Sequence, residues 1–71
     1  MGISHQVVRL AFSNGTIEVH GLPEGDPRVP AGCRWDARSA CHRAAAQDYA
    51  DIVMSFVRGE VPYEDEARDY P

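Results

Sequence analysis

The sequence contains no lysine, and all seven of its basic residues are arginine. An arginine side chain presents a planar fork of donors that suits phosphate and carboxylate, but a chain without lysine is also typical of a GC-rich or salt-adapted genome, which we favour. No apolar run approaches the roughly 18 residues that a membrane-spanning helix needs. The first residues also lack the basic end and long apolar stretch of a signal peptide. We therefore expect a cytoplasmic domain without a membrane span.

The chain also lacks the features of an ordinary enzyme. Its 71 residues predict a single domain with a thin core, and its 44% apolar content argues against disorder. The glycine-containing segment at residues 21–25 has no following Lys-Ser/Thr pair, so it does not match a nucleotide-binding loop. Asp36, Cys41 and His42 have the residue types of a nucleophilic set, but their spacing matches no known catalytic motif. We expect no catalysis and no cofactor in this domain.

Cysteine and histidine are scarce, and their spacing does not indicate a metal site. The potential ligands are Cys33, Cys41, His5, His20 and His42, and the two cysteines are too far apart for a zinc knuckle. Adjacent residues of a strand point to opposite faces, so Cys41 and His42 are not expected to share an ion. A disulfide between the cysteines is geometrically conceivable, but a cytoplasmic chain keeps thiols reduced. We interpret both as free thiols that act as small apolar residues.

The clearest secondary-structure signal is a β-hairpin near the N-terminus. Asn14 and Gly15 lie between two runs that alternate apolar and polar residues, and Asn-Gly favours a tight type I′ turn. A two-residue loop pairs Ser13 with Thr16, and therefore Phe12 with Ile17 and Leu10 with Val19. All four apolar side chains then share one face.

The remaining segments predict an α+β fold in which a small, mostly antiparallel sheet of two hairpins packs on one amphipathic helix. Three prolines and three glycines make residues 21–32 a loop. Residues 33–43 form the second hairpin with its tip near Arg38, and residues 44–58 carry an apolar stripe at helical spacing. Residues 61–64 add a short edge strand, and the ordered part spans about 7–65, followed by a frayed acidic tail at 66–71.

Positive charge is concentrated in one part of the chain, the end of the loop and the second hairpin. The chain carries a net charge of −4, which disfavours nonspecific binding to nucleic acid, yet residues 28–43 contain four arginines and one aspartate. Exposed arginines beside an aromatic residue suit phosphate contact and base stacking. We expect Trp35 itself to anchor the core, and Asp36 to pair with Arg38 or Arg43 at the hairpin tip. The predicted nucleic-acid-binding residues are Arg34, Arg38, His42 and Arg43.

The order of these motifs resembles the N-terminal damage-recognition domain of archaeal and bacterial XPB-type DNA repair helicases. In that family a hairpin containing "GTI" precedes a "W/F-D-x-R" turn, an "R-A" pair and a helix. The likeness covers residues 7–65. The corresponding segments here are residues 15–21 (GTIEVHG), 34–39 (RWDARS), 43–44 (RA), 49–53 (YADIV) and 61–65 (VPYED).

The resemblance implies a noncatalytic domain that precedes two helicase motor domains and helps to sense distorted duplex DNA in repair. It matches Trp35, Asp36, Arg38 and Arg43 to family positions, and it implies ATP and Mg²⁺ in the parent helicase only. The implied partners are duplex or distorted DNA and the motor domains. A second hypothesis is a protein-interaction domain whose acidic surface docks on the helicase core or on a partner nuclease.

Overall fold

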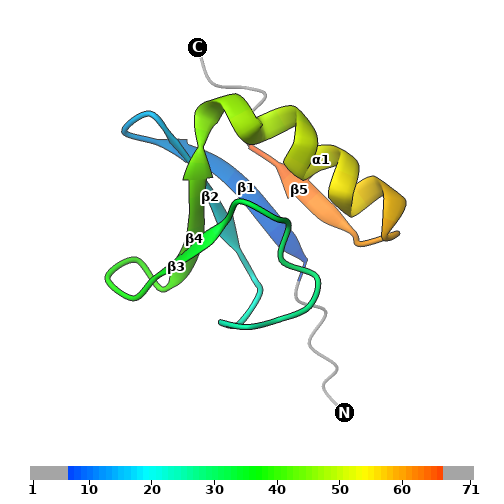
Figure 1. The fold of residues 1–71 in the computed structure, drawn as a ribbon, viewed down its shortest axis with the longest axis horizontal. Coiled ribbons are helices and arrows are strands. Elements are labelled where there is room, and N and C mark those ends of the chain that lie inside the picture. The colour runs from blue at the N-terminus through cyan, green and yellow to red at the C-terminus, as the bar shows by residue number, and fades with distance from the viewer. Residues whose placement is uncertain (1–6, 67–71) are drawn as a thin grey trace.

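The computed structural model describes residues 7–66 as a five-stranded sheet with one α-helix across part of one face (Figure 1). The small α+β architecture predicted from the sequence is therefore confirmed. The elements are β1 (Val8–Ser13), β2 (Thr16–His20), β3 (Arg34–Asp36), β4 (Cys41–Ala45), a 3₁₀ turn η1 (Ala46–Asp48), α1 (Tyr49–Arg58) and β5 (Tyr63–Asp65).

The first hairpin has the predicted register. Strands β1 and β2 pair antiparallel, with Ser13 opposite Thr16 and Phe12 opposite Ile17. Asn14 and Gly15 have φ angles of 52° and 80°, the two positive values that a type I′ turn requires. The Thr16 hydroxyl also donates a hydrogen bond of 2.7 Å to the Ser13 carbonyl oxygen and closes the turn.

The sheet order is β3-β4-β2-β1-β5, so the two hairpins meet where β2 pairs antiparallel with β4. The second hairpin, β3 with β4, is also confirmed. The predicted C-terminal edge strand is confirmed, but it spans Tyr63–Asp65 and so begins two residues later than predicted, just after Pro62. It lies at the edge of the sheet opposite β3. It pairs parallel with β1, so the sheet is mixed.

The helix begins later than the predicted residue 44. Ala44 belongs to β4, where it lies opposite Ile17 and is only 7% exposed. Burial and ladder pairing thus override the helical preference of the alanine-rich segment. The chain leaves β4 after Ala45, makes one 3₁₀ turn, and begins α1 at Tyr49.

The core lies between α1 and the face of the sheet that the first hairpin was predicted to bury. Its buried residues from the strands, the loop and the helix are Val8, Leu10, Ile17, Val19, Leu22, Ala44, Ile52 and Phe56. Trp35 is only half-buried and does not belong to this cluster, so its prediction as the core anchor is wrong. Phe56 is the largest fully buried side chain instead.

Of the predicted frayed tail, only Glu66 is described, and its backbone N–H donates a hydrogen bond of 2.9 Å to the Leu10 carbonyl oxygen. Residues 67–71 lie outside the described part. Within residues 7–66, no helix has the length and hydrophobicity needed to cross a bilayer.

Candidate nucleic-acid interface

The tip of the second hairpin is organised by the carboxylate of Asp36. Oδ1 accepts a hydrogen bond of 3.0 Å from the backbone N–H of Arg38, and Oδ2 accepts one of 3.0 Å from the Ser39 hydroxyl. The Asp36 carbonyl oxygen also accepts the Ser39 N–H at 3.2 Å. The turn closes through Ala40, whose φ of 54° is left-handed. An aspartate at the start of a turn stabilises it in this way because its short side chain reaches the backbone two residues later.

Arg43 holds this tip against the neighbouring hairpin. Its Nε donates a hydrogen bond of 2.6 Å to Asp36 Oδ2, which confirms the predicted pairing of Asp36 with Arg43. Its Nη2 donates one of 2.8 Å to the Ser39 hydroxyl. Toward β2, Arg43 donates to Thr16 Oγ1 at 2.9 Å and pairs with Glu18 Oε2 at 2.8 Å. The guanidinium therefore ties β3, β4 and β2 together.

These contacts perturb the ionisation of the groups involved. The hydrogen bonds from Arg43 and Ser39 hold the pKa of Asp36 below its usual value, and Asp36 in turn raises the pKa of Arg43. The pKa of Glu18 is lowered mainly by its hydrogen bond with His20, with Arg43 contributing through its charge. The network thus keeps both carboxylates and the guanidinium charged.

Two arginines on the hairpin, Arg34 and Arg38, are exposed and their side chains take no part in this network. Arg34 lies on β3 directly opposite Arg43, and Arg38 lies in the turn beyond β3. Among residues 7–66, neither guanidinium takes part in an ion pair or a side-chain hydrogen bond. Since Asp36 and Glu18 neutralise Arg43, the positive charge that the hairpin offers to solvent comes from Arg34 and Arg38.

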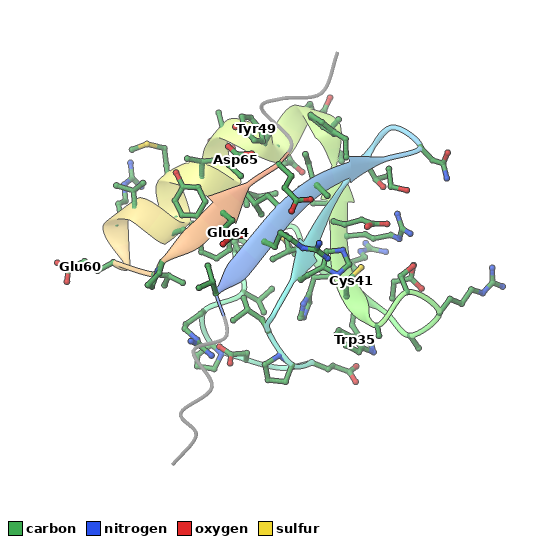
Figure 2. All side chains as sticks on the ribbon, turned by 180° about the vertical axis from the view of Figure 1, so that it is seen from behind. Trp35, Cys41, Tyr49, Glu60, Glu64 and Asp65 are labelled. Carbon is green, nitrogen blue, oxygen red and sulfur yellow. The ribbon has the colours of Figure 1, made fainter. Side chains whose placement is uncertain are left out.

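The other two predicted binding residues are placed differently. Arg43 is partly buried in the network described above, and His42 is only 3% exposed. His42 faces the core side of the sheet opposite Trp35, and the two rings pack edge to face with centroids 5.0 Å apart. Figure 2 shows Trp35 and Cys41 at the hairpin end of the sheet. The structure thus brings Arg34 and Arg38 to the surface, while His42 and Arg43 support the hairpin from within.

Thr16 and Glu18 were not among the sequence-predicted site residues, although both contact Arg43. Their contact depends on the pairing of β2 with β4, which are separated in sequence by the loop at residues 21–33, by β3 and by the turn at residues 37–40. The only local signal was the alternation that places Thr16 and Glu18 on the polar face of β2.

Both cysteines are free thiols, as predicted, and they differ in burial. Cys33 is half-buried and Cys41 is buried. Burial raises the pKa of each thiol, and a nearby carboxylate adds to the effect: Asp48 for Cys33 and Glu18 for Cys41. A thiol of this kind is a poor nucleophile at neutral pH because the thiolate is the reactive form.

Comparison with known proteins identifies the family. No curated protein matches the chain. The family model that matches is described as the Xeroderma pigmentosum group B helicase damage recognition domain, and it covers residues 10–67. This match covers more than half of the chain and agrees with the motifs that predicted it. The chain belongs to the damage recognition domain family of Xeroderma pigmentosum group B helicases.

Proposed function

We propose that this domain is a noncatalytic DNA-engaging module of an XPB-like repair helicase, and that it senses distortion of the duplex. Its membership of the damage recognition family supports a role in recognising damaged DNA. The observation that carries the proposal is the exposed pair Arg34 and Arg38 on a hairpin that Asp36 and Arg43 hold in shape. In this proposal the two arginines contact phosphates and Arg43 is a positioning residue.

Two phosphate contacts give a weak and salt-sensitive interaction. Each neutralised phosphate contributes about −0.9 to the slope of log K against log salt on duplex DNA, so two contacts predict a slope near −2. The net charge of −4 opposes binding by the isolated domain. The motor domains, which would use ATP and Mg²⁺, would supply most of the affinity of the whole helicase.

Discrimination between intact and damaged DNA would then come from deformability. Phosphate contacts carry no base sequence, but they report the spacing and direction of the backbone. A mismatched or damaged site costs less energy to bend or unstack, so a rigid hairpin that fits a bent backbone binds such a site more tightly. The fixed geometry of the Asp36 turn suits this role because a flexible hairpin would follow either duplex equally well.

Fluorescence anisotropy with intact and mismatched duplexes, at low and physiological salt, tests the proposal. We expect tighter binding to the mismatched duplex, and we expect Arg38→Ala to weaken binding and to reduce the salt slope by about 1. Arg58→Ala is the matched control because Arg58 is also exposed but ends α1, away from the hairpin. Equal losses in both variants, or no binding at low salt, would contradict the proposal.

A second function is favoured by the outer side of α1. Met54 and Val57 are 45% and 53% exposed, and acidic side chains at Asp51 and Glu60 are exposed near them. This combination suits docking on a surface that is apolar at its centre and basic around it, such as a motor domain or a partner nuclease. Calorimetric titration with separately produced motor domains tests it: Met54→Lys would abolish docking, while Arg38→Ala would leave it intact.

A further inference from the structure

The two neighbouring strands β2 and β4 bring three different metal-binding side chains together on the polar face of the sheet. Glu18 and His20 are two residues apart on β2 and therefore point to the same side. Val19 lies opposite His42, and the same antiparallel register continued by one residue sets Cys41 opposite His20. The ligand atoms of Glu18, His20 and Cys41 all lie within 4.8 Å of one another.

We propose that Glu18 Oε1, His20 Nε2 and Cys41 Sγ bind one Zn²⁺ ion, with water as the fourth ligand. Zinc takes nitrogen, sulfur and oxygen ligands in a tetrahedron, and bonds of 2.0–2.3 Å place neighbouring ligand atoms about 3.3–3.8 Å apart. Glu18 Oε1 and His20 Nε2 are already 3.0 Å apart. The present separations, at most 4.8 Å, therefore lie within about 1 Å of those that a tetrahedral zinc site requires.

The surroundings of the three ligands also suit a divalent ion. Arg43 occupies Glu18 Oε2, the oxygen that the ion does not need, and so fixes the carboxylate from behind. Arg43 also pairs with Asp36, the residue opposite Cys41 on β3. With the thiolate formed, Zn²⁺ and Arg43 carry three positive charges against three negative charges on Glu18, Asp36 and Cys41. The cluster is neutral with the ion bound.

Binding exchanges protons for the metal. The Cys41 thiol is protonated without an ion because burial and the charge of Glu18 raise its pKa. As the sulfur–zinc bond forms, the sulfur–hydrogen bond breaks and one proton leaves to the solvent. His20 must likewise present an unprotonated Nε2 in place of the hydrogen bond to Glu18.

Sequence spacing does not reveal this site. A zinc knuckle is recognised in a sequence by closely spaced cysteines, whereas here Cys41 lies 21 residues after His20 and reaches it only through the sheet. A bound ion would tie the end of β2 to the start of β4, next to the turn of the hairpin that carries Arg34 and Arg38. Zinc binding at these three side chains does not require DNA, since none of them is a proposed DNA contact.

The test is titration of the untagged, metal-free chain with Co²⁺, followed by displacement with Zn²⁺. Tetrahedral Co²⁺ bound to a thiolate gives intense visible bands and a sulfur-to-cobalt charge-transfer band. We expect both, with one equivalent of Co²⁺ and loss of the bands on adding Zn²⁺. Cys41→Ser should remove the charge-transfer band, whereas Cys33→Ser, the matched control, should retain it.

Two further variants define the remaining ligands. His20→Gln and Glu18→Gln should each weaken Co²⁺ binding at least about tenfold, as loss of groups around a metal site does. His5→Ala should leave the affinity unchanged. Circular dichroism shows whether each variant folds, and Cys41→Ala serves as the second variant if the serine hydroxyl disturbs the buried position. The proposal is overturned if the wild-type chain gives no charge-transfer band, or if the band survives in a folded Cys41 variant.

Discussion

The hydroxyl group of Tyr49, the first residue of α1, donates a hydrogen bond to Oδ2 of Asp65, the last residue of β5. Figure 2 shows the two side chains next to each other at the end of the sheet far from Trp35. The bond connects the beginning of the helix with the strand that follows it. It thereby closes the unit formed by α1, the intervening turn and β5.

Removing the Tyr49 hydroxyl group should destabilise this unit. Tyr49→Phe keeps the ring beside Phe12, whose centroid lies 6.1 Å away, but removes the donor to a carboxylate. We expect the free energy of unfolding to fall by about 1.5–3 kcal/mol, the usual range for a hydrogen bond to a charged group. Urea unfolding followed by circular dichroism measures it.

Tyr63→Phe is the matched control. Tyr63 packs on Phe56 with ring centroids 5.9 Å apart, and within the described residues no hydrogen bond of its hydroxyl is found. Its removal should leave stability nearly unchanged. A loss as large as that of Tyr49→Phe would show that the Tyr49 bond contributes no specific stabilisation.

Gly21 is required where the chain leaves β2. Its φ is +100°, and a Cβ atom there would lie 2.9 Å from the Val7 carbonyl oxygen. Gly21→Ala therefore combines an unfavourable backbone conformation with a backbone clash, and we expect a loss of about 2 kcal/mol or more in thermal or urea unfolding.

Gly25→Ala separates the two effects. Gly25 has a similarly positive φ of +82°, but a Cβ would meet nothing within 4 Å. This variant should cost only the conformational strain, about 1 kcal/mol. If Gly21→Ala and Gly25→Ala lower the free energy of unfolding equally, the Val7 backbone moves away from the new Cβ atom without a cost in stability.

The Asp26–Arg28 pair predicts an unusual titration in the loop. Arg28 donates to Asp26 Oδ1 through its backbone N–H at 2.8 Å and to Oδ2 through its guanidinium at 2.8 Å. The side-chain bonds, followed by the backbone bond, lower the pKa of Asp26 from 3.8 to about 2. Because the folded-state pKa is depressed, the stabilisation is present above pH 3.8 and is lost as the pH falls toward 2.

Carboxyl-detected NMR titration measures this directly. The Asp26 midpoint should lie at about 2 in the wild-type chain and move back toward 3.8 in Arg28→Ala. Arg58→Ala removes an equal charge outside the loop and should leave the midpoint in place. A midpoint near 3.8 in the wild-type chain would show that the Arg28 contacts do not persist in solution.

The sequence predicted those elements whose determinants are local. Asn14 and Gly15 set the turn and its register. Gly59 marks the end of α1 because the apolar residues at helical spacing stop just before it. The turn after the helix was less visible, since Glu60, not glycine, takes the left-handed conformation, with a φ of 56°. Ala44 was assigned to the helix because its burial against Ile17 depends on a strand distant in sequence.

The candidate site shows the same division. The Asp36 turn was predictable because its contacts span two or three residues. The contact between Arg43 and Thr16, 27 residues apart, requires the register between the two hairpins, which no local pattern specifies. The sequence therefore identified the arginines but did not distinguish the exposed Arg34 and Arg38 from the engaged Arg43.

That distinction leads to a prediction for Arg43→Lys. Lysine keeps the positive charge but presents a single ammonium group, which cannot reproduce the fork that contacts Asp36, Ser39, Thr16 and Glu18 together. If Arg43 positions the hairpin, Arg43→Lys should speed amide hydrogen exchange in the turn at residues 37–40 and weaken duplex binding despite the unchanged net charge. Arg38→Lys, which retains a charge at an exposed and unpaired position, should preserve both exchange and binding. If Arg43 instead contacts phosphate through its charge alone, Arg43→Lys should bind duplex like the wild-type chain, since a lysine in its place still neutralises a phosphate.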